Sequence, residues 1–385
     1  NSEVIMNRCR VENCFSGSSG AGIYARASEP TGQRTMRLTL DDCVLTGNTS
    51  SGAFGGAVSI GGNNANLYLT ITDSIFTNNS AREGGAISAE SVPTSGAVYL
   101  YVNISSSSFT GNTATTGRGG ALYLRQAQEA IVSSTTFAGN SAVSPGGGVY
   151  ANEGFTHIFR NCTFSGHAGT AIYSFNVGTL RYEHCTVVNN GTGIYSGISQ
   201  GRGAPVFTHS IVAQNSAIDV DAAIVRSEGY NIFGRPFTFQ SRTCNSVSGL
   251  CSSDRVNIDP QLLPLGPAGG IGMTHVPRFG SPAIDGGNPT TCVLGPDPRG
   301  LPRAAGPGDI GAIERQPAEP PLDLDADGVD DLCADQCPGS PPVPSDALGC
   351  PLPSGACCLA NGLCMLLVEP NCTSQGGTWR GAATT

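Results

Sequence analysis

Apolar and polar positions alternate along most of the chain, and the pattern repeats. In residues 67–90, LYLTITDSIFTNNSAREGGAISAE, the apolar Phe76 is followed three positions later by Asn79 and then by a Gly-Gly-Ala-Ile step. Short alternating segments bounded by Gly, Asn and Ser predict β-strands, whereas a helical repeat would not carry so many Gly and β-branched residues. The apolar position recurs at intervals of 23 to 34 residues, at Val11, Leu45, Phe76, Phe109, Phe137, Phe164, Val187 and Val212.

This period predicts a stack of coils. Each repeat is long enough for one coil of three short strands and three turns, and each coil would pair only with its neighbours, as in a parallel β-helix. Eight coils at about 4.8 Å each would span about 38 Å. Residues at equivalent positions of successive coils would then form columns.

Two columns are expected to face the core, and a third to lie in a turn. The apolar column is the first, and a column of small residues two positions earlier also faces inward by the two-residue alternation of strands. Its Cys are expected to be buried free thiols, because in-register side chains suit a disulfide poorly. The Asn column is expected to stack in a turn, where Asn tolerates a left-handed conformation and bonds its own backbone. The small column reads Cys9, Cys43, Ser74, Ser107, Thr135, Cys162, Cys185 and Ser210.

A fourth column carries tyrosines and is expected to face outward, because sequence neighbours such as Leu122 and Leu124 would face the core. Stacked exposed aromatic rings suit sugar binding or an adhesive contact. They also stabilise a sheet face by themselves, so both roles remain open. The column reads Tyr24, Ser59, Ser88, Tyr123, Tyr150, Tyr173 and Tyr195, and its candidate ligand-binding residues are Tyr123, Tyr150, Tyr173 and Tyr195.

The paired signals GGA[ILV] and FxxN, present over roughly residues 5–223, resemble the polymorphic outer-membrane protein repeat. The resemblance implies an all-β, right-handed, single-stranded parallel β-helix over residues 1–223. It also implies a location on a bacterial surface, where many proteins with this repeat act as adhesins.

The pattern loosens over residues 224–315. CNSVSGLC predicts a small disulfide loop between Cys244 and Cys251. The strings SPAIDGGNP, DPRGLPR and DIGAIE resemble the closing segment of the choice-of-anchor Q family, which implies a secreted bacterial protein. We expect their charged residues to form a salt-bridged cap over the last open coil, because a solenoid needs a cap, although a catalytic cluster is an alternative. These residues are Asp285, Arg299, Arg303, Asp309 and Glu314.

Residues 316–353 contain DLDADGVDDLCADQC, in which carboxylates alternate ahead of a Gly. Such oxygens suit Ca²⁺, and an acidic solvated linker is the alternative. Together with CPGSPPVPSDALGCPL, the run resembles a thrombospondin type-3 repeat, apart from a one-residue insertion between Cys333 and Cys337 that affects the role of Asp335. The candidate calcium ligands are Asp323, Asp325, Asp327, the carbonyl of Val329, Asp331 and Asp335. Residues 354–385 resemble a small Cys-rich secreted module, and we expect both ends of the sequence to be truncated.

The amino-acid composition excludes several classes of function. All 20 basic residues are Arg, which excludes a P-loop lysine or a Schiff-base lysine, and no basic run supports nucleic-acid binding. Residues 316–385 carry 9 acidic residues against one Arg, so a net charge of −8 out of −9 lies there. Seven of the 15 Cys follow residue 332, which favours an oxidising, extracellular compartment. No apolar run is long enough to span a membrane.

Enzymatic candidates are few. A glycosidase needs two carboxylates about 5–9 Å apart, and Asp42 with Asp73, or Asp219 with Asp221, are the weak candidates. His184 and His209 share the column of Asp42, and we expect exposed turn residues there, not a metal site. We therefore expect a non-enzymatic, secreted or surface-attached bacterial protein for adhesion or glycan binding, with a calcium-binding module. A polysaccharide lyase or glycoside hydrolase on the same fold is the alternative.

Overall fold

The computed structural model describes residues 1–28, 34–92, 99–197, 203–235, 251–289, 295–303 and 307–316, together with strands at 354–358, 364–368 and 378–382. The chain divides into two compact units. The first comprises Asn1–Pro277 and Ser281–Gln316, and the second comprises Arg278–Gly280 and Pro317–Thr385. No helix occurs in the described ranges, so the described elements of both units are strands.

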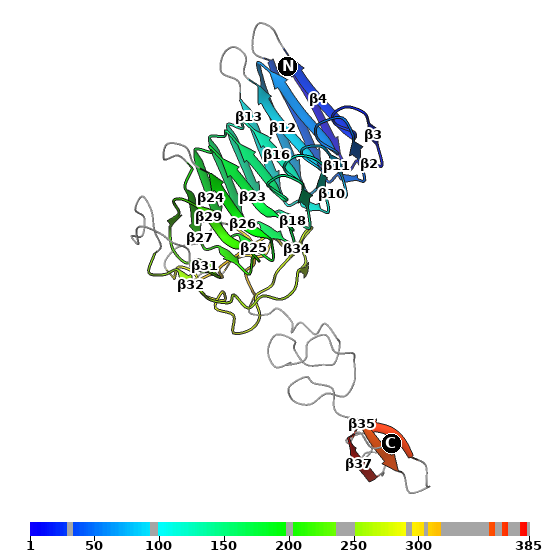
Figure 1. The fold of residues 1–385 in the computed structure, drawn as a ribbon, viewed down its shortest axis with the longest axis vertical. Coiled ribbons are helices and arrows are strands. Elements are labelled where there is room, and N and C mark those ends of the chain that lie inside the picture. Colours follow the sequence, from blue (N-terminus) through cyan, green and yellow to red (C-terminus); the bar gives the residue numbers. More distant parts are fainter. Residues whose placement is uncertain are drawn as a thin grey trace. The chain divides into compact units, whose positions relative to one another are not determined.

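Four parallel sheets wind around the first unit (Figure 1). We name them A to D in the order in which each coil passes through them. Sheet A consists of β1 (Ser2–Asn7), β5 (Arg34–Asp41), β9 (Ala65–Thr72), β13 (Leu100–Ser105), β17 (Glu129–Ser133), β21 (Thr156–Arg160), β24 (Thr179–Glu183), β27 (Pro205–Thr208) and β30 (Arg226–Ser227). Sheet B consists of β2 (Arg10–Glu12), β6 (Val44–Thr46), β10 (Ile75–Thr77), β14 (Ser108–Thr110), β18 (Thr136–Ala138), β22 (Thr163–Ser165), β25 (Thr186–Val188), β28 (Ile211–Ala213), β31 (Ile232–Phe233) and β32 (Arg255–Val256).

The other two sheets complete each coil. Sheet C contains only two-residue strands, β3 (Phe15–Ser16), β7 (Thr49–Ser50), β11 (Ser80–Ala81), β15 (Thr113–Ala114) and β19 (Ser141–Ala142). Sheet D consists of β4 (Ile23–Ser28), β8 (Val58–Asn63), β12 (Ile87–Val92), β16 (Leu122–Arg125), β20 (Val149–Asn152), β23 (Thr170–Phe175), β26 (Thr192–Gly197) and β29 (Ile218–Ala222). The first five coils therefore have four strands each, one more than expected, and sheet C ends where the coils shorten.

The apolar column lies in register through the core, as predicted. Phe76 pairs with Phe109, and their rings stack with centroids 4.6 Å apart. Phe109–Phe137 and Phe137–Phe164 continue the stack at 5.0 and 4.7 Å. Eight coils carry strands of sheets A, B and D, and two partial coils follow, because Phe233 and Val256 extend the same column. The sequence pattern did not identify these two partial coils.

The small column also faces the core, and its hydroxyls bond the preceding coil. The Ser74 hydroxyl accepts the backbone N–H of Cys43 at 3.0 Å, and the Ser210 hydroxyl accepts that of Cys185 at 3.1 Å. The thiols of Cys43, Cys162 and Cys185 are buried and free, as expected, whereas that of Cys9 in the first coil is free but only half-buried.

The Asn column stacks, but its residues do not adopt the expected left-handed conformation. That conformation belongs to the preceding position, such as Gly47 and Asn78. The buried side chains instead bond between coils: the Asn48 amide donates to Asn79 Oδ1 at 2.9 Å and also to the Val11 carbonyl at 2.9 Å. These side-chain amides form a ladder of hydrogen bonds in which each Asn connects three successive coils. We call it the amide ladder.

The described residues after β32 form no further coil. β33 (Gly266–Pro267) and β34 (Met273–Thr274) pair antiparallel, and the chain then runs back along the outer side of sheet B. There Thr136 Oγ1 donates to the Met273 carbonyl at 2.7 Å, and Ala312 N donates to Thr186 Oγ1 at 3.0 Å. We call the described residues of 258–277 and 281–316 the C-terminal segment of the first unit.

The second unit contains three antiparallel strands, β35 (Ser354–Cys358), β36 (Cys364–Val368) and β37 (Thr378–Ala382), with β35 between the other two. The candidate calcium ligands Asp323, Asp325, Asp327, Val329, Asp331 and Asp335 lie outside the described residues.

Candidate functional site

The outer face of sheet D holds the column in which tyrosines were expected. Pairing along the sheet aligns Tyr123 with Tyr150, Tyr150 with Tyr173, and Tyr173 with Tyr195. Leu122 and Leu124, on either side of Tyr123, are fully buried in the core, so the tyrosine points to the opposite side of the sheet, as predicted.

The four rings form a tight stack. Centroid distances are 5.4 Å for Tyr123–Tyr150, 5.3 Å for Tyr150–Tyr173 and 4.4 Å for Tyr173–Tyr195, with interplanar angles of 7–9°. Tyr123 and Tyr150 are only 5% exposed, so they are far less accessible than expected. Burial raises the pKa of both phenols, and the Arg118 guanidinium lies 5.0 Å from the Tyr150 ring.

This geometry limits what the stack can bind. A sugar packs against the flat face of an aromatic ring, but here each inner ring face is covered by the next ring. The inner ring faces are therefore closed to a ligand, and the main contribution of the stack in the described structure is to hold successive coils together.

A hollow opens on the same face where the tyrosine column is interrupted. Pairing aligns Tyr24 with Ser59 and Ser59 with Ser88, so two small residues separate Tyr24 from Tyr123. The gap spans three strand spacings, about 14 Å. The hollow has a volume of about 90 Å³, and its lining includes Tyr24, Arg26, Phe54, Gly61, Ser59, Ser88 and Glu90.

Aromatic side chains stand at both ends of this hollow. Tyr24 is 53% exposed, in contrast to Tyr123 and Tyr150. At the other end, Phe54 lies beside Tyr123, with centroids 6.3 Å apart and the rings tilted by 32°. The sequence showed Ser59 and Ser88 within the tyrosine column, but the hollow also depends on Phe54 and Gly61, which lie outside that column.

Charged groups line the hollow one column further along the strands. Pairing aligns Arg26, Gly61, Glu90 and Arg125 on four successive coils. Arg26 Nη1 donates to Tyr24 Oη at 3.4 Å, and this contact raises the pKa of the guanidinium. Arg125 Nη1 lies 2.6 Å from Glu90 Oε1 and pairs with it.

Of the two expected carboxylate pairs, Asp42 and Asp73 lie in one column of successive coils and are exposed, whereas Asp219 and Asp221 differ in burial. Asp219 is buried, and its Oδ1 accepts both the backbone N–H and the side-chain amide of Asn215. Asp221 is exposed and follows Tyr195 in the tyrosine column. Asp42 and Asp73 occupy successive left-handed turn positions, and Asp42 Oδ2 lies 3.7 Å from Arg8 Nε on the exposed surface.

His184 and His209 are buried, so the expectation that they are exposed turn residues was wrong. The C-terminal segment covers them: His209 Nε2 accepts the backbone N–H of Asn288 at 3.0 Å. Their rings stack at 4.7 Å, and His209 stacks in turn on Tyr230 at 5.3 Å. Burial lowers the pKa of His209 to about 4 and that of His184 well below its ordinary value.

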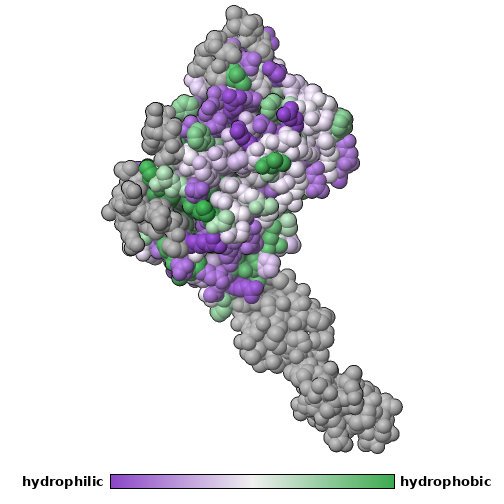
Figure 2. Space-filling model, viewed as in Figure 1, coloured by the Kyte–Doolittle hydropathy of each residue, from purple (hydrophilic) through white to green (hydrophobic). Residues whose placement is uncertain are grey.

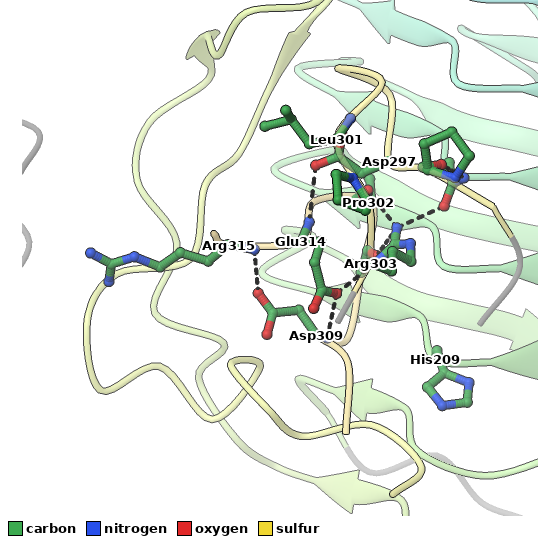
Figure 3. Close-up of polar contacts among 12 residues, drawn as sticks. His209, Asp297, Leu301, Pro302, Arg303, Asp309, Glu314 and Arg315 are labelled. Carbon is green, nitrogen blue, oxygen red and sulfur yellow. Dashed lines mark hydrogen bonds and ion pairs between the residues drawn. The ribbon is translucent and has the colours of Figure 1, made fainter. Parts of the chain in front are cut away.

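The charged residues of the C-terminal segment form a buried network (Figure 3). Arg303 lies beside Glu314, with Nη1 3.4 Å from Oε2, and its Nη2 donates to Asn161 Oδ1 at 2.7 Å. Arg299 pairs with Asp297 at 2.7 Å, and Asp309 Oδ1 accepts the backbone N–H of Asp285 at 2.8 Å. The network is salt-bridged as expected, but its contacts with Asn161 and Thr186 place it against the side of the coils, not over the last coil alone.

Burial determines the pKa values of the charged groups in this network. It raises the pKa of Asp309 to about 7 and lowers that of Arg303. Because Arg303 also donates to the carbonyls of Gly311 and Ala312, its guanidinium is occupied by the protein itself. These groups fasten a segment to the coils and are not free to act on a substrate.

The described residues contain no cluster of three or more His, Cys, Asp or Glu that could hold a metal ion. Cys251 is disulfide-bonded, while its expected partner Cys244 lies outside the described residues. The face in Figure 2 is mainly hydrophilic or neutral, with scattered hydrophobic residues. Within the described ranges, no helix is both long and apolar enough to cross a membrane.

Comparison with known proteins gives one match. A family model described as a right-handed beta helix region matches residues 56–235, from the second coil to the end of β31. No curated protein and no solved structure matches the chain significantly. Together with the parallel sheets, the match gives an all-β chain whose first unit is built on a right-handed parallel β-helix.

Proposed function

We propose that the chain is a secreted or surface-attached bacterial protein that binds extracellular glycans without modifying them, and that the outer face of sheet D carries the binding. The hollow between Tyr24 and Phe54 is the observation that supports this proposal. It combines accessible aromatic side chains with the hydroxyls of Ser59 and Ser88 and with charged groups. Concave sites with a few convergent polar groups are the usual form of small-ligand sites.

The proposal places ligand binding at the hollow, not at the stacked tyrosines that the sequence predicted. The stacked faces of Tyr123, Tyr150 and Tyr173 are covered by one another, whereas Tyr24 is more than half exposed. The stacked tyrosines then contribute by keeping the strands of sheet D in line. Binding without catalysis is supported by the positions of Asp219 and Asp309, which are buried and whose Oδ1 atoms accept hydrogen bonds within the protein.

The secreted location rests on the resemblance of residues 280–314 to the choice-of-anchor Q closing segment and on the disulfide at Cys251. Structural disulfides persist in oxidising compartments and are rare in the cytosol.

Glycan-array binding by the full chain tests the proposal. We expect binding that Tyr24→Ala and Phe54→Ala each weaken about tenfold or more, while Phe175→Ala, an exposed aromatic variant further along sheet D, leaves it unchanged. Binding that is insensitive to Tyr24→Ala and Phe54→Ala would contradict the assignment to this face. Release of shortened or unsaturated products would favour a carbohydrate-active enzyme instead.

We also propose that residues 316–353 bind Ca²⁺ through Asp323, Asp325, Asp327, the Val329 carbonyl, Asp331 and Asp335. Alternating carboxylate oxygens and a carbonyl are the ligands that Ca²⁺ takes in proteins. Calorimetric titration of the full chain should show Ca²⁺ binding that the double variant Asp325→Ala/Asp327→Ala abolishes and Asp346→Asn retains. Equal binding by both variants would leave an acidic linker as the better description.

A further inference from the structure

We infer that the hollow on sheet D receives one acidic sugar residue, whose anionic group pairs with Arg26 and whose hydroxyls donate to Glu90. This inference rests on the proposed glycan-binding function and specifies the class of sugar. It follows from three features of the hollow: the charge of Arg26, the empty position at Gly61 and the exposed ring of Tyr24.

Arg26 forms no ion pair with a carboxylate in the part of the chain that the structure describes, although the more distant Glu90 contributes to its raised pKa. Its guanidinium contacts Tyr24 Oη at 3.4 Å, a neutral and weakly placed acceptor. Glu90 has its own cation, because Arg125 Nη1 lies 2.6 Å from Glu90 Oε1. The wall formed by Arg26 therefore favours an anion, and guanidinium groups bind carboxylate and sulfate groups through paired hydrogen bonds.

Gly61 separates the two charged sides of the hollow, which are formed by Arg26 and Glu90. It pairs with Arg26 on one side and with Glu90 on the other, so the two charged residues are two strand spacings apart, about 10 Å. A longer side chain at this position would stand between them. Because Gly61 has none, a ligand can reach both Arg26 and Glu90 at once.

A sugar with an acidic substituent matches this arrangement. Its carboxylate or sulfate accepts from Arg26, and its hydroxyls, which lie elsewhere on the ring, donate to the remaining acceptor positions of Glu90. The apolar face of the ring packs on Tyr24, whose ring is the accessible one in this column. Ser59 and Ser88, which line the hollow between the walls, are small enough to leave room for it.

Titration of the full chain with glucuronic acid, glucose 6-sulfate and glucose, followed by ligand-observed NMR, tests the inference. We expect at least one of the two acidic sugars to bind about tenfold or more tightly than glucose. Comparing the two distinguishes a carboxylate from a sulfate as the preferred group. The preference should shrink at high salt, because Arg26 is exposed and its charge is screened.

Three variants locate the effect. Arg26→Gln should remove the preference for the acid, and Gly61→Leu should block all three sugars by filling the hollow. A Cβ at Gly61 meets only the Glu90 carbonyl oxygen, at 3.5 Å, an ordinary van der Waals contact, and the backbone there has no left-handed φ. Arg8→Gln, which removes an exposed charge in the turn between β1 and β2, should change nothing and serves as the control.

The outcomes separate the two proposals. Equal affinity for glucose and the acids, lost in Gly61→Leu, would overturn the inference while the proposed glycan-binding function stands. Retention of the acid preference in Arg26→Gln would also overturn it. Binding of no sugar, here and on the glycan array, would contradict the proposed function as well.

Discussion

Asn215 donates both its backbone N–H and its side-chain amide to one oxygen of Asp219, at 3.2 and 2.9 Å. This contact ends the amide ladder that begins with Asn48. At Asn48, Asn79, Asn112 and Asn190 the same two donors go to the residue of the next coil, as in Asn79 to Asn112 Oδ1. Three residues after Phe233, at the position of the Asn column, the sequence has Pro236, which carries no side-chain acceptor. Asp219, four residues along the same coil, supplies it.

The end of the ladder should tolerate an amide but not an apolar residue. Asp219→Ala leaves two buried donors of Asn215 without an acceptor, so we expect a loss of about 2–3 kcal/mol in the free energy of local opening. Asp219→Asn keeps the accepting oxygen, and burial of the carboxylate already raises the Asp219 pKa, so a loss of less than about 1 kcal/mol is expected. Hydrogen exchange of peptides covering residues 211–222 measures both. Equal losses would show that the charge, not the acceptor, matters.

All five histidines are buried with lowered pKa values, which predicts sensitivity to acid. Burial lowers the pKa of His157, His167 and His209 to about 4, and those of His184 and His275 also fall. Below pH 6.5, the ordinary histidine value, the unfolded chain binds protons that the folded chain does not, so stability falls as the pH drops toward 4.

The buried carboxylates act in the opposite direction but are fewer. Asp309, with a pKa of about 7, takes up a proton in the folded state first, so it adds stability as the pH falls from about 7 to 4. Five histidines outweigh it, and we expect a net loss of more than about 3 kcal/mol between pH 7 and pH 5. Urea unfolding midpoints at the two pH values measure the loss. A midpoint that rises on acidification would contradict the prediction.

His167→Asn isolates one histidine. His167 takes the place of an Asn in the ladder: its Nδ1 lies 2.8 Å from Asn190 Oδ1 and its Nε2 3.4 Å from Asn140 Nδ2. An Asn offers the same donor and acceptor without a titrating group, so the ladder should persist. We expect the variant to remove about 2 kcal/mol of the loss between pH 7 and pH 5. An unchanged pH dependence would exclude His167 as a contributor.

The sequence predicted those parts of the fold that the repeat determines. The Phe76–Phe109 stack, the inward small column and the outward direction of Tyr123 all follow from the period and from strand alternation. The partial coil at Phe233 was not predicted, because the Asn and Gly signals that mark the complete coils are absent there. Sheet C was missed because strands of two residues carry no alternation pattern.

Contacts between distant segments could not be predicted in this way. His209 meets Asn288, and Thr163 meets Thr274, across 79 and 111 residues. These pairs join repeat to non-repeat sequence, so no column relates them, and the burial of His184 and His209 depends on them. The hollow was missed for a related reason, since Phe54 reaches Tyr123 from a turn of another coil.

Arg303 should hold the C-terminal segment against the coils. Arg303→Met removes the buried cation that contacts Glu314 and Asn161, and we expect a loss of about 3–5 kcal/mol in the local stability of residues 295–316. Arg303→Lys keeps the charge but cannot form the same set of bonds, so its loss should be intermediate. Hydrogen exchange of this segment measures both variants, with Arg8→Met, an exposed site, expected to cost less than about 1 kcal/mol. Unchanged exchange in Arg303→Met would mean that the apolar contacts of Ala283 and Ile310 suffice.

Tyr150 distinguishes the structural role of the tyrosine stack from ligand contact. Its ring lies between those of Tyr123 and Tyr173, so Tyr150→Ala removes two stacked contacts and nearly all of a buried side chain. We expect a loss of about 3 kcal/mol in the free energy of unfolding, whereas Tyr150→Phe keeps the ring and should cost less than about 1 kcal/mol. Both are read from urea unfolding, and sugar binding by Tyr150→Phe should equal that of the unaltered chain, because the hydroxyl lies outside the hollow. A stable Tyr150→Phe variant that no longer binds sugar would instead place ligand contact on the stack itself.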